Sequence, residues 1–336
     1  MALFSQDFGI DLGTHYTMIA EGGVLLKREP TVVTIAIEEQ KIVEIGQSAK
    51  DMYGRVPSSL EIARPLRHGV IADYEVTQKL LEYMIKEVTG PVRLFHPRVA
   101  VTVPYGVTSV ESRAVQEAVL EAGAREVFLI EQPLAAAIGV DLPINTPTGN
   151  MILLLGGGAC QAGVLAMYGI VAAETLRRGG VDLDEAIATY IRRKYGMIIA
   201  QPTAERIKLE IGAAIPQDEE QGIEVQGQDQ VSGLPKPLTL KTGEVVEALQ
   251  DPLMEIVETA RKVLEKTPPE LVSDIIDRGI ALCGGTALLP GMEQLLTKEL
   301  GVPTYLVDNP TTCVVEGASR ALAPDIFPKI RRNLKT

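Results

Sequence analysis

Hydrophobic and polar positions follow two periods along this chain, and these periods predict an order of strands and helices. Short runs of apolar and β-branched residues, as at 98–103, are typical of buried strands. Apolar residues three and four positions apart, as over 76–88, are typical of amphipathic helices. In the first half the pattern predicts strands at 8–11, 17–20, 32–37, 98–103 and 127–130, and helices at 44–53, 76–88, 110–122 and 134–139.

The second half repeats this order, beginning with an apolar strand at 151–154 that runs into glycines. Asp251 is predicted to cap a helix whose first residue is Pro252, and the basic tail 329–336 is predicted to fray. The other predicted elements are helices at 184–195, 203–212 and 292–300, and a strand at 275–283. We therefore predict a duplicated α/β fold with domains at 1–146 and 147–336, and small lobes at about 32–64 and about 180–250.

Composition and charge narrow the possible functions. The chain has 336 residues and a net charge of −12, which does not suit nucleic acid as a main partner. Its three cysteines and three histidines lack CxxC and HxxxH spacing, so neither disulfides nor a zinc site is expected. No charged side chain occurs from 142 to 173, but glycines interrupt this stretch, and buried strands fit it better than a transmembrane helix. The N-terminus lacks a signal-peptide pattern, and a cytoplasmic protein is expected.

Three glycine turns, each following an apolar strand, carry the candidate chemistry. They lie at residues 11–14, 156–158 and 284–286. Glycine lets the backbone approach a phosphate closely, the Thr14 hydroxyl can donate to one, and Asp11 could hold Mg²⁺ through water molecules. Each turn alone is also compatible with an ordinary tight hairpin. Together they favour a cradle for a nucleotide.

Longer motifs in the chain resemble the MreB family of bacterial actin homologues, within the actin, Hsp70 and sugar-kinase superfamily. The resemblance runs from about residue 8 to about residue 322 and includes GIDLGT at 9–14, RPLRHGVIADYEVT at 64–77, GAREVFLIEQPLAAAIG at 123–139, TAERIKLEIG at 203–212 and VSGLPK at 231–236. It implies an actin-like fold of two ribonuclease H-like α/β domains with four subdomains, and ATP or ADP with Mg²⁺ in a cleft between the halves.

The same resemblance implies a set of site residues. Without it, Glu205 and Lys208 would be interpreted as a solvated helix face. The metal would lie at Asp11, and the nucleotide at Gly13, Thr14, His15, Gly156, Gly157, Gly158, Glu205, Lys208, Gly284, Gly285, Thr286 and Ala287.

The second glycine loop departs from the family pattern VVDIGGGTTEVA. Here the sequence is ILLLGGGACQAG, so the family's metal-holding aspartate falls on Leu154, its threonines on Ala159 and Cys160, and its glutamate on Gln161. The glutamate thought to position the attacking water falls on Gln132, although actin itself uses glutamine there. Because leucine cannot coordinate a hydrated cation, we predict weak or absent ATPase activity, with Asp11 and a degenerate Gln132 as the remaining catalytic candidates.

The resemblance also implies a biological role, that of a filament protein which scaffolds cell-wall synthesis at the inner membrane and determines rod shape. Its implied partners are further copies of itself, other MreB paralogues and cell-wall elongation proteins. The loop residues Leu94 and Phe95 are expected either to anchor their loop in the core or to touch the inner face of the membrane. The alternatives are a non-polymerising paralogue that modulates a competent family member, and a kinase or Hsp70-like ATPase of the same fold.

Overall fold

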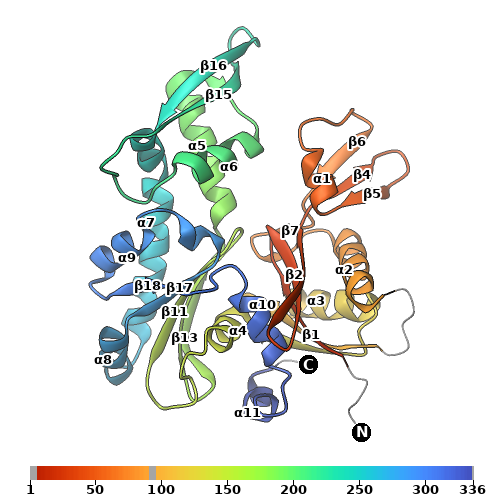
Figure 1. Cartoon of the computed structure of the whole chain (residues 1–336), viewed down its shortest axis with the longest axis vertical. Helices are drawn as coiled ribbons and strands as arrows, with labels where there is room; N and C mark the ends of the chain where they lie inside the picture. The colour runs from red at the N-terminus through yellow and green to blue at the C-terminus, as the bar shows by residue number, and fades with distance from the viewer. Residues whose placement is uncertain (1–5, 91–95, 335–336) are drawn as a thin grey trace.

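Two five-stranded sheets with the same strand order form the centre of the computed structural model, which describes residues 6–90 and 96–334 (Figure 1). The first sheet has the order β10-β9-β1-β2-β3 and the second β13-β12-β11-β17-β18. In each, an antiparallel three-stranded meander continues into two parallel strands. The strands are β1 (Asp7–Leu12), β2 (Tyr16–Glu21), β3 (Val24–Pro30), β9 (Arg98–Val103), β10 (Glu126–Glu131), β11 (Asn150–Leu155), β12 (Cys160–Ala166), β13 (Gly169–Leu176), β17 (Ile280–Cys283) and β18 (Thr304–Leu306). The predicted duplication of an α/β unit is confirmed.

Helices α4 (Gln132–Gly139) and α10 (Cys313–Arg320) lie between the two sheets. Their backbones come into direct contact, because a Cβ atom at Gly139 would lie 1.9 Å from the Cys313 carbonyl oxygen and one at Gly317 would lie 1.8 Å from that of Ala135. Helix α10 also packs on β1, so a segment near the end of the chain helps to hold the first sheet. This helix was not predicted from the sequence.

The outer face of each sheet is covered by longer helices whose apolar stripes form two separate cores. Helices α2 (Tyr74–Thr89) and α3 (Ser109–Glu121) cover the first sheet. The second is covered mainly by α5 (Gly180–Tyr195), α7 (Thr242–Lys266) and α9 (Met292–Leu300).

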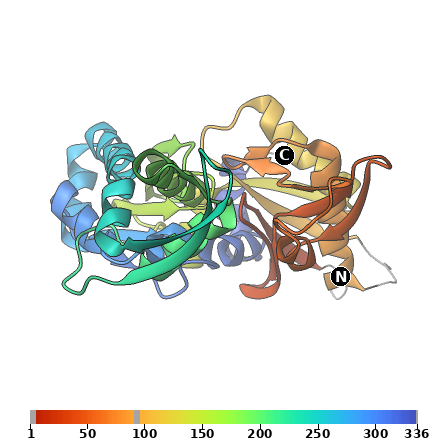
Figure 2. The ribbon, with the colours of Figure 1, turned by 90° about the horizontal axis from the view of Figure 1, so that it is seen from above.

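A smaller sheet extends from each unit, and in the view from above the two units stand side by side (Figure 2). The first consists of β5 (Lys41–Ile45), β4 (Val33–Ala36) and β6 (Leu60–Ala63), with α1 (Gln47–Asp51) beside it. The second consists of β14 (Met197–Ile198), β15 (Gly222–Asp229) and β16 (Pro235–Lys241), next to α6 (Gln201–Ile211). A two-stranded hairpin, β7 (Leu66–Arg67) and β8 (Val70–Ile71), lies before α2.

Several predicted element boundaries are wrong. Asp251 does not cap a helix, because α7 begins at Thr242 and contains Pro252 in its interior. An interior proline costs about 3 kcal/mol, and the burial of Leu249, Leu253 and the rest of that face offsets it. Residues 275–278 belong to α8 (Pro269–Arg278), and the strand begins only at Ile280.

Two other regions also differ from their predictions. Residues 44–53 are not one helix, because β5 continues to Ile45 before the single short helix α1. The tail is folded as far as residue 334. Helix α11 (Phe327–Ile330) places Ile330 fully inside the apolar core around α4 and α10, which we call the central core. The uncharged stretch 142–173 forms β11, β12 and most of β13, and none of the described helices is long and apolar enough to cross a membrane.

Candidate functional site

The first glycine turn joins β1 to β2 and contacts the second glycine turn directly. Its conformation is held by a hydrogen bond of 3.2 Å from the Gly13 N–H to the Tyr16 carbonyl oxygen. A Cβ atom at Gly158 would lie 2.2 Å from Thr14 Oγ1, and one at Gly157 would lie 2.7 Å from the Cβ atom of His15. Both positions therefore require glycine because of close approach between the two units, and the sequence could not reveal this reason.

The third glycine turn is tied to the second by a side chain. Thr286 Oγ1 donates a hydrogen bond of 2.9 Å to the Gly156 carbonyl oxygen. Gly284 has a φ of 91° and packs against the backbone of Leu155, so a side chain would not fit there. Around Gly285 there is open space. The side chain of Ala287 is buried in the core that covers the second sheet, so only the backbone of Ala287 could face a ligand.

Helix α6 places Glu205 and Lys208 beside these turns. Glu205 Oε1 lies 3.3 Å from His15 Nε2 and 3.2 Å from Lys50 Nζ, so it links the second unit both to the first turn and to α1 beside the first small sheet. The hydrogen bond from His15 and the nearby charges of His15 and Lys50 lower the pKa of Glu205 to about 2. Glu205 is therefore not part of a solvated helix face.

Lys208 is held by the start of α5. Its Nζ atom donates to the Gly180 carbonyl oxygen at 2.6 Å and lies 2.7 Å from Asp184 Oδ1. Asp184 is almost completely buried, and burial raises its pKa while the charge of Lys208 opposes that shift. The N–H groups of Gly180 and Val181 donate to carbonyl oxygens of the second turn, so Lys208 lies next to that turn.

Asp11 lies at the end of β1, in a buried polar cluster. Its Oδ1 atom accepts hydrogen bonds from Thr102 Oγ1 and from Gln132 Nε2, the latter at 3.3 Å. Burial raises the pKa of Asp11, and these two hydrogen bonds oppose the increase. Within residues 6–90 and 96–334, Asp11 Oδ2 accepts no hydrogen bond, so this oxygen is the one that could face a hydrated cation.

Leu154 takes no part in this polar cluster. It is 6% exposed and packs in the central core, paired with Gln161 across the antiparallel ladder and with Cys283 across the parallel one. The described residues contain no group of three or more carboxylates, histidines or cysteines that could hold a metal ion. A Mg²⁺ ion at this site would therefore depend on Asp11, on water and on the phosphates of a nucleotide.

The site fits the phosphates of a nucleotide. Across the described part of the chain, the N–H groups of Gly157 and Gly158 have no hydrogen-bond acceptor, so they are available to an anion. The hydroxyl of Thr14 accepts a hydrogen bond of 2.9 Å from the Gly69 N–H and keeps its own proton for donation. Lys50, Gly69, Gly180 and Asp184 were not predicted as site residues, because their roles come from contacts between segments far apart in the sequence.

The structure brings together all the predicted nucleotide-binding residues. Leu94 and Phe95 lie outside the described residues. The described segments on either side are the end of α2 and the start of β9, and His96 Nδ1 lies 2.8 Å from the Gly123 carbonyl oxygen.

Comparisons with known proteins agree with this architecture. The family model described as MreB/Mbl protein matches residues 5–325. The cell shape-determining protein MreB of Escherichia coli K12 is 46% identical over 326 residues, covering 95% of this chain and 94% of its own length. The cell shape-determining protein Mbl of Bacillus subtilis is 40% identical over 316 residues, covering 94% and 95%.

A solved structure is also similar over nearly the whole chain. The crystal structure of MreB 5 of Spiroplasma citri bound to AMPPNP has a TM-score of 0.91 and 30% sequence identity, and covers 98% of both chains. The structure of the same protein bound to ADP has a TM-score of 0.90 and 29% identity, again over 98% of both chains. The predicted actin-like fold is therefore confirmed.

Proposed function

The chain belongs to the MreB/Mbl family, and on that premise we propose that it is an actin-like filament protein that helps to determine cell shape. The observation that carries this proposal is the meeting of three glycine turns from both units at one site, on a fold shared with cell shape-determining relatives. A site built from both units can respond to a nucleotide by changing how the units are arranged, which is what a filament subunit needs.

Electron microscopy and sedimentation of the purified protein, with and without nucleotide, test this function. Filaments that depend on nucleotide are expected. A protein that stays monomeric alone but changes the filaments of a competent family member would be the modulating paralogue instead. The names of the relatives do not favour that alternative, nor a kinase or an Hsp70-like ATPase.

ATP or ADP is the proposed ligand, with Mg²⁺ held through water by Asp11. The free N–H groups at Gly157 and Gly158 support phosphate binding, and the solved relative binds ADP and AMPPNP. Glu205 and Lys208 would contact the ribose and base, after breaking part of their present contacts with Lys50 and Asp184. Titration with a fluorescent ATP analogue measures this binding directly.

Hydrolysis is proposed to be weak or absent. Leu154 stands where the resemblance places a metal-holding aspartate, and its side chain is packed in the core, where it can neither coordinate a cation nor orient water. Loss of one electrostatic group of this kind typically lowers a rate by about 10²–10³-fold. Phosphate release at saturating ATP and Mg²⁺ provides the measurement, and turnover similar to that of an ordinary family member would refute the proposal.

Self-association is proposed to run head to tail through the second unit. Val231 and Leu234, at the tip of the β15–β16 hairpin, are 97% and 65% exposed. Helix α8 lies at the opposite end of that unit (Figure 1), and its residue Ile276 is 51% exposed. Tyr305, on the edge strand β18, is 40% exposed. Exposed apolar residues at two opposite ends suit a heterologous contact, which repeats without closing and so produces a filament.

Peripheral contact with the inner face of the cell membrane, from the cytoplasm, is proposed through Leu94 and Phe95. Two apolar side chains bind a membrane weakly, but a filament multiplies the contact. Co-sedimentation with liposomes should decrease in a Leu94→Ser, Phe95→Ser double variant, and unchanged binding would refute the role of this loop.

We also propose that the domains divide at residues 146 and 147, and that other MreB paralogues and cell-wall elongation proteins are partners.

A further inference from the structure

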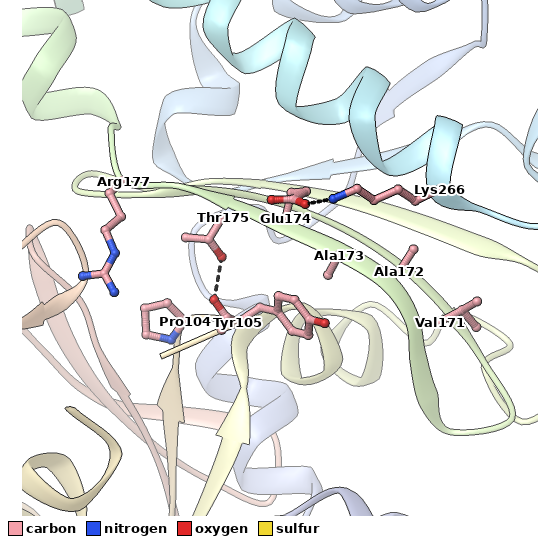
Figure 3. Close-up of a pocket in the computed structure, with 10 residues that line it drawn as sticks. Pro104, Tyr105, Val171, Ala172, Ala173, Glu174, Thr175, Arg177 and Lys266 are labelled. Carbon is pink, nitrogen blue, oxygen red and sulfur yellow. Dashed lines mark hydrogen bonds and ion pairs between the residues drawn. The ribbon is translucent and has the colours of Figure 1, made fainter. Parts of the chain in front are cut away.

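A groove of about 490 Å³ runs along the outer edge of β13, which is an end strand of the second sheet. One wall consists of residues 171–175 of this strand together with Arg177 and Lys266, and the other consists of residues 104–106 of the first unit (Figure 3). Successive side chains of a strand point to opposite faces of its sheet. A groove that touches five residues in a row therefore runs along the backbone edge of the strand, and we call it the β13 groove.

The hydrogen bonds of β12 show which way the backbone of β13 faces. The Gly156 N–H donates to the Ala159 carbonyl oxygen, in the register of the β11–β12 ladder. Hydrogen-bonded pairs alternate with non-bonded pairs along an antiparallel ladder, so the backbone groups of Gln161 bond to β11. The residues on either side of Gln161 then turn their backbone groups to β13.

Alternate residues of β13 consequently face the groove with their backbone groups. Ala162 lies opposite Glu174, so the backbone of Glu174 bonds to β12, as does that of Ala172 two residues earlier. Ala173 and Thr175 turn their N–H and C=O groups outwards instead. Among the described residues, no group forms a hydrogen bond with these two N–H groups or these two carbonyl oxygens. The edge is therefore ready to pair with another strand.

A β-bulge limits the length of this edge. The register of β12 and β13 shifts between Val164 and Leu165, which leaves Val171 as the extra residue of β13. Pairing is regular from Ala172 to Leu176, a length of about 17 Å at about 3.4 Å per residue. Four outward backbone groups over this length suit a short extended peptide, which can join a sheet as one more strand.

The charged residues of the β13 groove favour an acidic peptide. Lys266 forms an ion pair with Glu174, and Arg177 forms one with Glu111 on α3, yet the side chains of both cations remain about half-exposed. The residues that line the groove include two cations against one anion, on a chain whose net charge is −12. An acidic side chain of a partner can approach either cation, whereas a basic one would meet a surplus of positive charge.

We propose that the β13 groove binds an extended, acidic segment of a partner protein, which adds to the second sheet as a strand beside β13. The segment pairs with the outward groups of Ala173 and Thr175, places an acidic side chain near Lys266 or Arg177, and packs against the Tyr105 ring (Figure 3). Because the first unit forms the second wall, a peptide end or loop can enter where the folded sheet of another copy cannot. This binding goes beyond the proposed function and does not involve the nucleotide.

Fluorescence anisotropy of the full-length protein, without nucleotide, tests this binding. The probe is the fluorescein-labelled peptide Glu-Val-Thr-Val-Thr-Glu, and the control peptide has lysine in place of both glutamates. The acidic peptide should bind about tenfold more tightly than the control. Methylation of alternate amide nitrogens removes the donors from one edge of the peptide. Of the two alternately methylated peptides, one should lose binding and the other should keep it, because only one edge faces β13.

Variants of the two walls separate backbone pairing from charge. Ala173→Pro removes an outward N–H and keeps the bonds between β13 and β12, since proline is tolerated where the N–H faces away from the sheet. It should weaken binding of the acidic peptide about tenfold, and Ala173→Ser, which keeps the N–H, should not. Lys266→Glu should reverse the preference between the acidic and basic peptides. Lys262→Glu is the matched control, with the same charge change on α7 outside the groove.

Amide exchange measured by NMR gives a readout that does not depend on the folding of a variant. The acidic peptide should slow exchange of the Ala173 and Thr175 amides about tenfold. The amides of Ala172 and Glu174 already bond to β12, so their exchange should change little.

Several outcomes would overturn the proposal. These are no binding of the acidic peptide at about 1 mM, equal binding of both methylated peptides, or an equal exchange response at Ala172 and Ala173. Protection of Ala173 and Thr175 without peptide, only at concentrations where copies associate, would assign the groove to a second copy instead. A protein that binds the peptide but no ATP analogue would refute the nucleotide site alone.

Discussion

Replacing Leu154 with aspartate tests the proposal that this leucine makes hydrolysis weak or absent at the proposed nucleotide site. The leucine is 6% exposed, and its neighbours include Cys283 and the apolar residues of the central core. Removing a buried leucine side chain costs about 2–5 kcal/mol, and an unpaired carboxylate in the same place adds a desolvation cost or takes up a proton. Without ligand, Leu154→Asp should therefore lose about 3–5 kcal/mol of stability, or roughly 4–7 °C in Tm.

The metal should reverse part of this loss. A bound Mg²⁺–ATP complex gives the new carboxylate a cation, so it should raise the Tm of Leu154→Asp more than that of the natural protein. Leu154→Asn is the matched control, because it has the same size as aspartate but carries no charge. Thermal unfolding is measured for the three proteins with and without Mg²⁺ and ATP.

Phosphate release completes the test. If the missing carboxylate limits hydrolysis, Leu154→Asp should release phosphate at least tenfold faster than the natural protein, while Leu154→Asn should not. A Leu154→Asp variant that is as stable as the natural protein without ligand, or that gains no more from Mg²⁺–ATP than Leu154→Asn does, would refute this reasoning.

Three further predictions follow from contacts at the site and at the ends of the second unit. Glu205→Gln should lower stability at pH 7, because the depressed pKa of Glu205 stabilises the fold above its ordinary value of 4.5 and this contribution disappears as the pH falls towards 2. The shift corresponds to at most about 3.4 kcal/mol, which solvent screening reduces to about 1 kcal/mol, and denaturant titrations from pH 7 to pH 2 should show a flatter profile for the variant. Gly158→Ala should weaken ATP binding at least tenfold, since the new Cβ atom would lie 2.2 Å from Thr14 Oγ1. Gly243→Ala, on α7 with its nearest neighbour Glu220 Oε1 at an ordinary 3.5 Å, should bind ATP normally, and equal affinities of the two variants would contradict the close approach of the two turns. Val231→Asp should raise the concentration needed for sedimentable filaments several-fold and Val231→Ile should not, whereas identical assembly would exclude the hairpin tip from the contact between copies.

Local patterns in the sequence were sufficient to predict the duplicated architecture. The stripe from Val76 to Val88 and the apolar runs before each glycine turn depend on neighbouring residues, so their periods report helix and strand directly. These local patterns occur in the same order in both halves of the chain, and the two central sheets accordingly have the same strand order. The identity of the site followed from longer motifs, and the structure brings these residues together.

Features that depend on contacts between distant segments of the chain were determined only by the tertiary structure. Helix α7 continues through Pro252 because its buried face packs against the second sheet, a contact that local preference does not include. Helix α10 has a short sequence without a strong helix signal, yet Gly317 allows it to lie against α4 at the centre of the molecule. Hydrogen bonds also connect four separate elements or loops in the interior, since the Tyr105 N–H donates to Gln161, Gln161 donates to Gln132, and Gln132 donates to Asp11. Sequence alone identified Leu154, Gln132 and Gln161 as departures from a family pattern. Three-dimensional packing decided that Gln161 donates a hydrogen bond to Gln132 in the interior, because an amide can both donate and accept where a carboxylate can only accept.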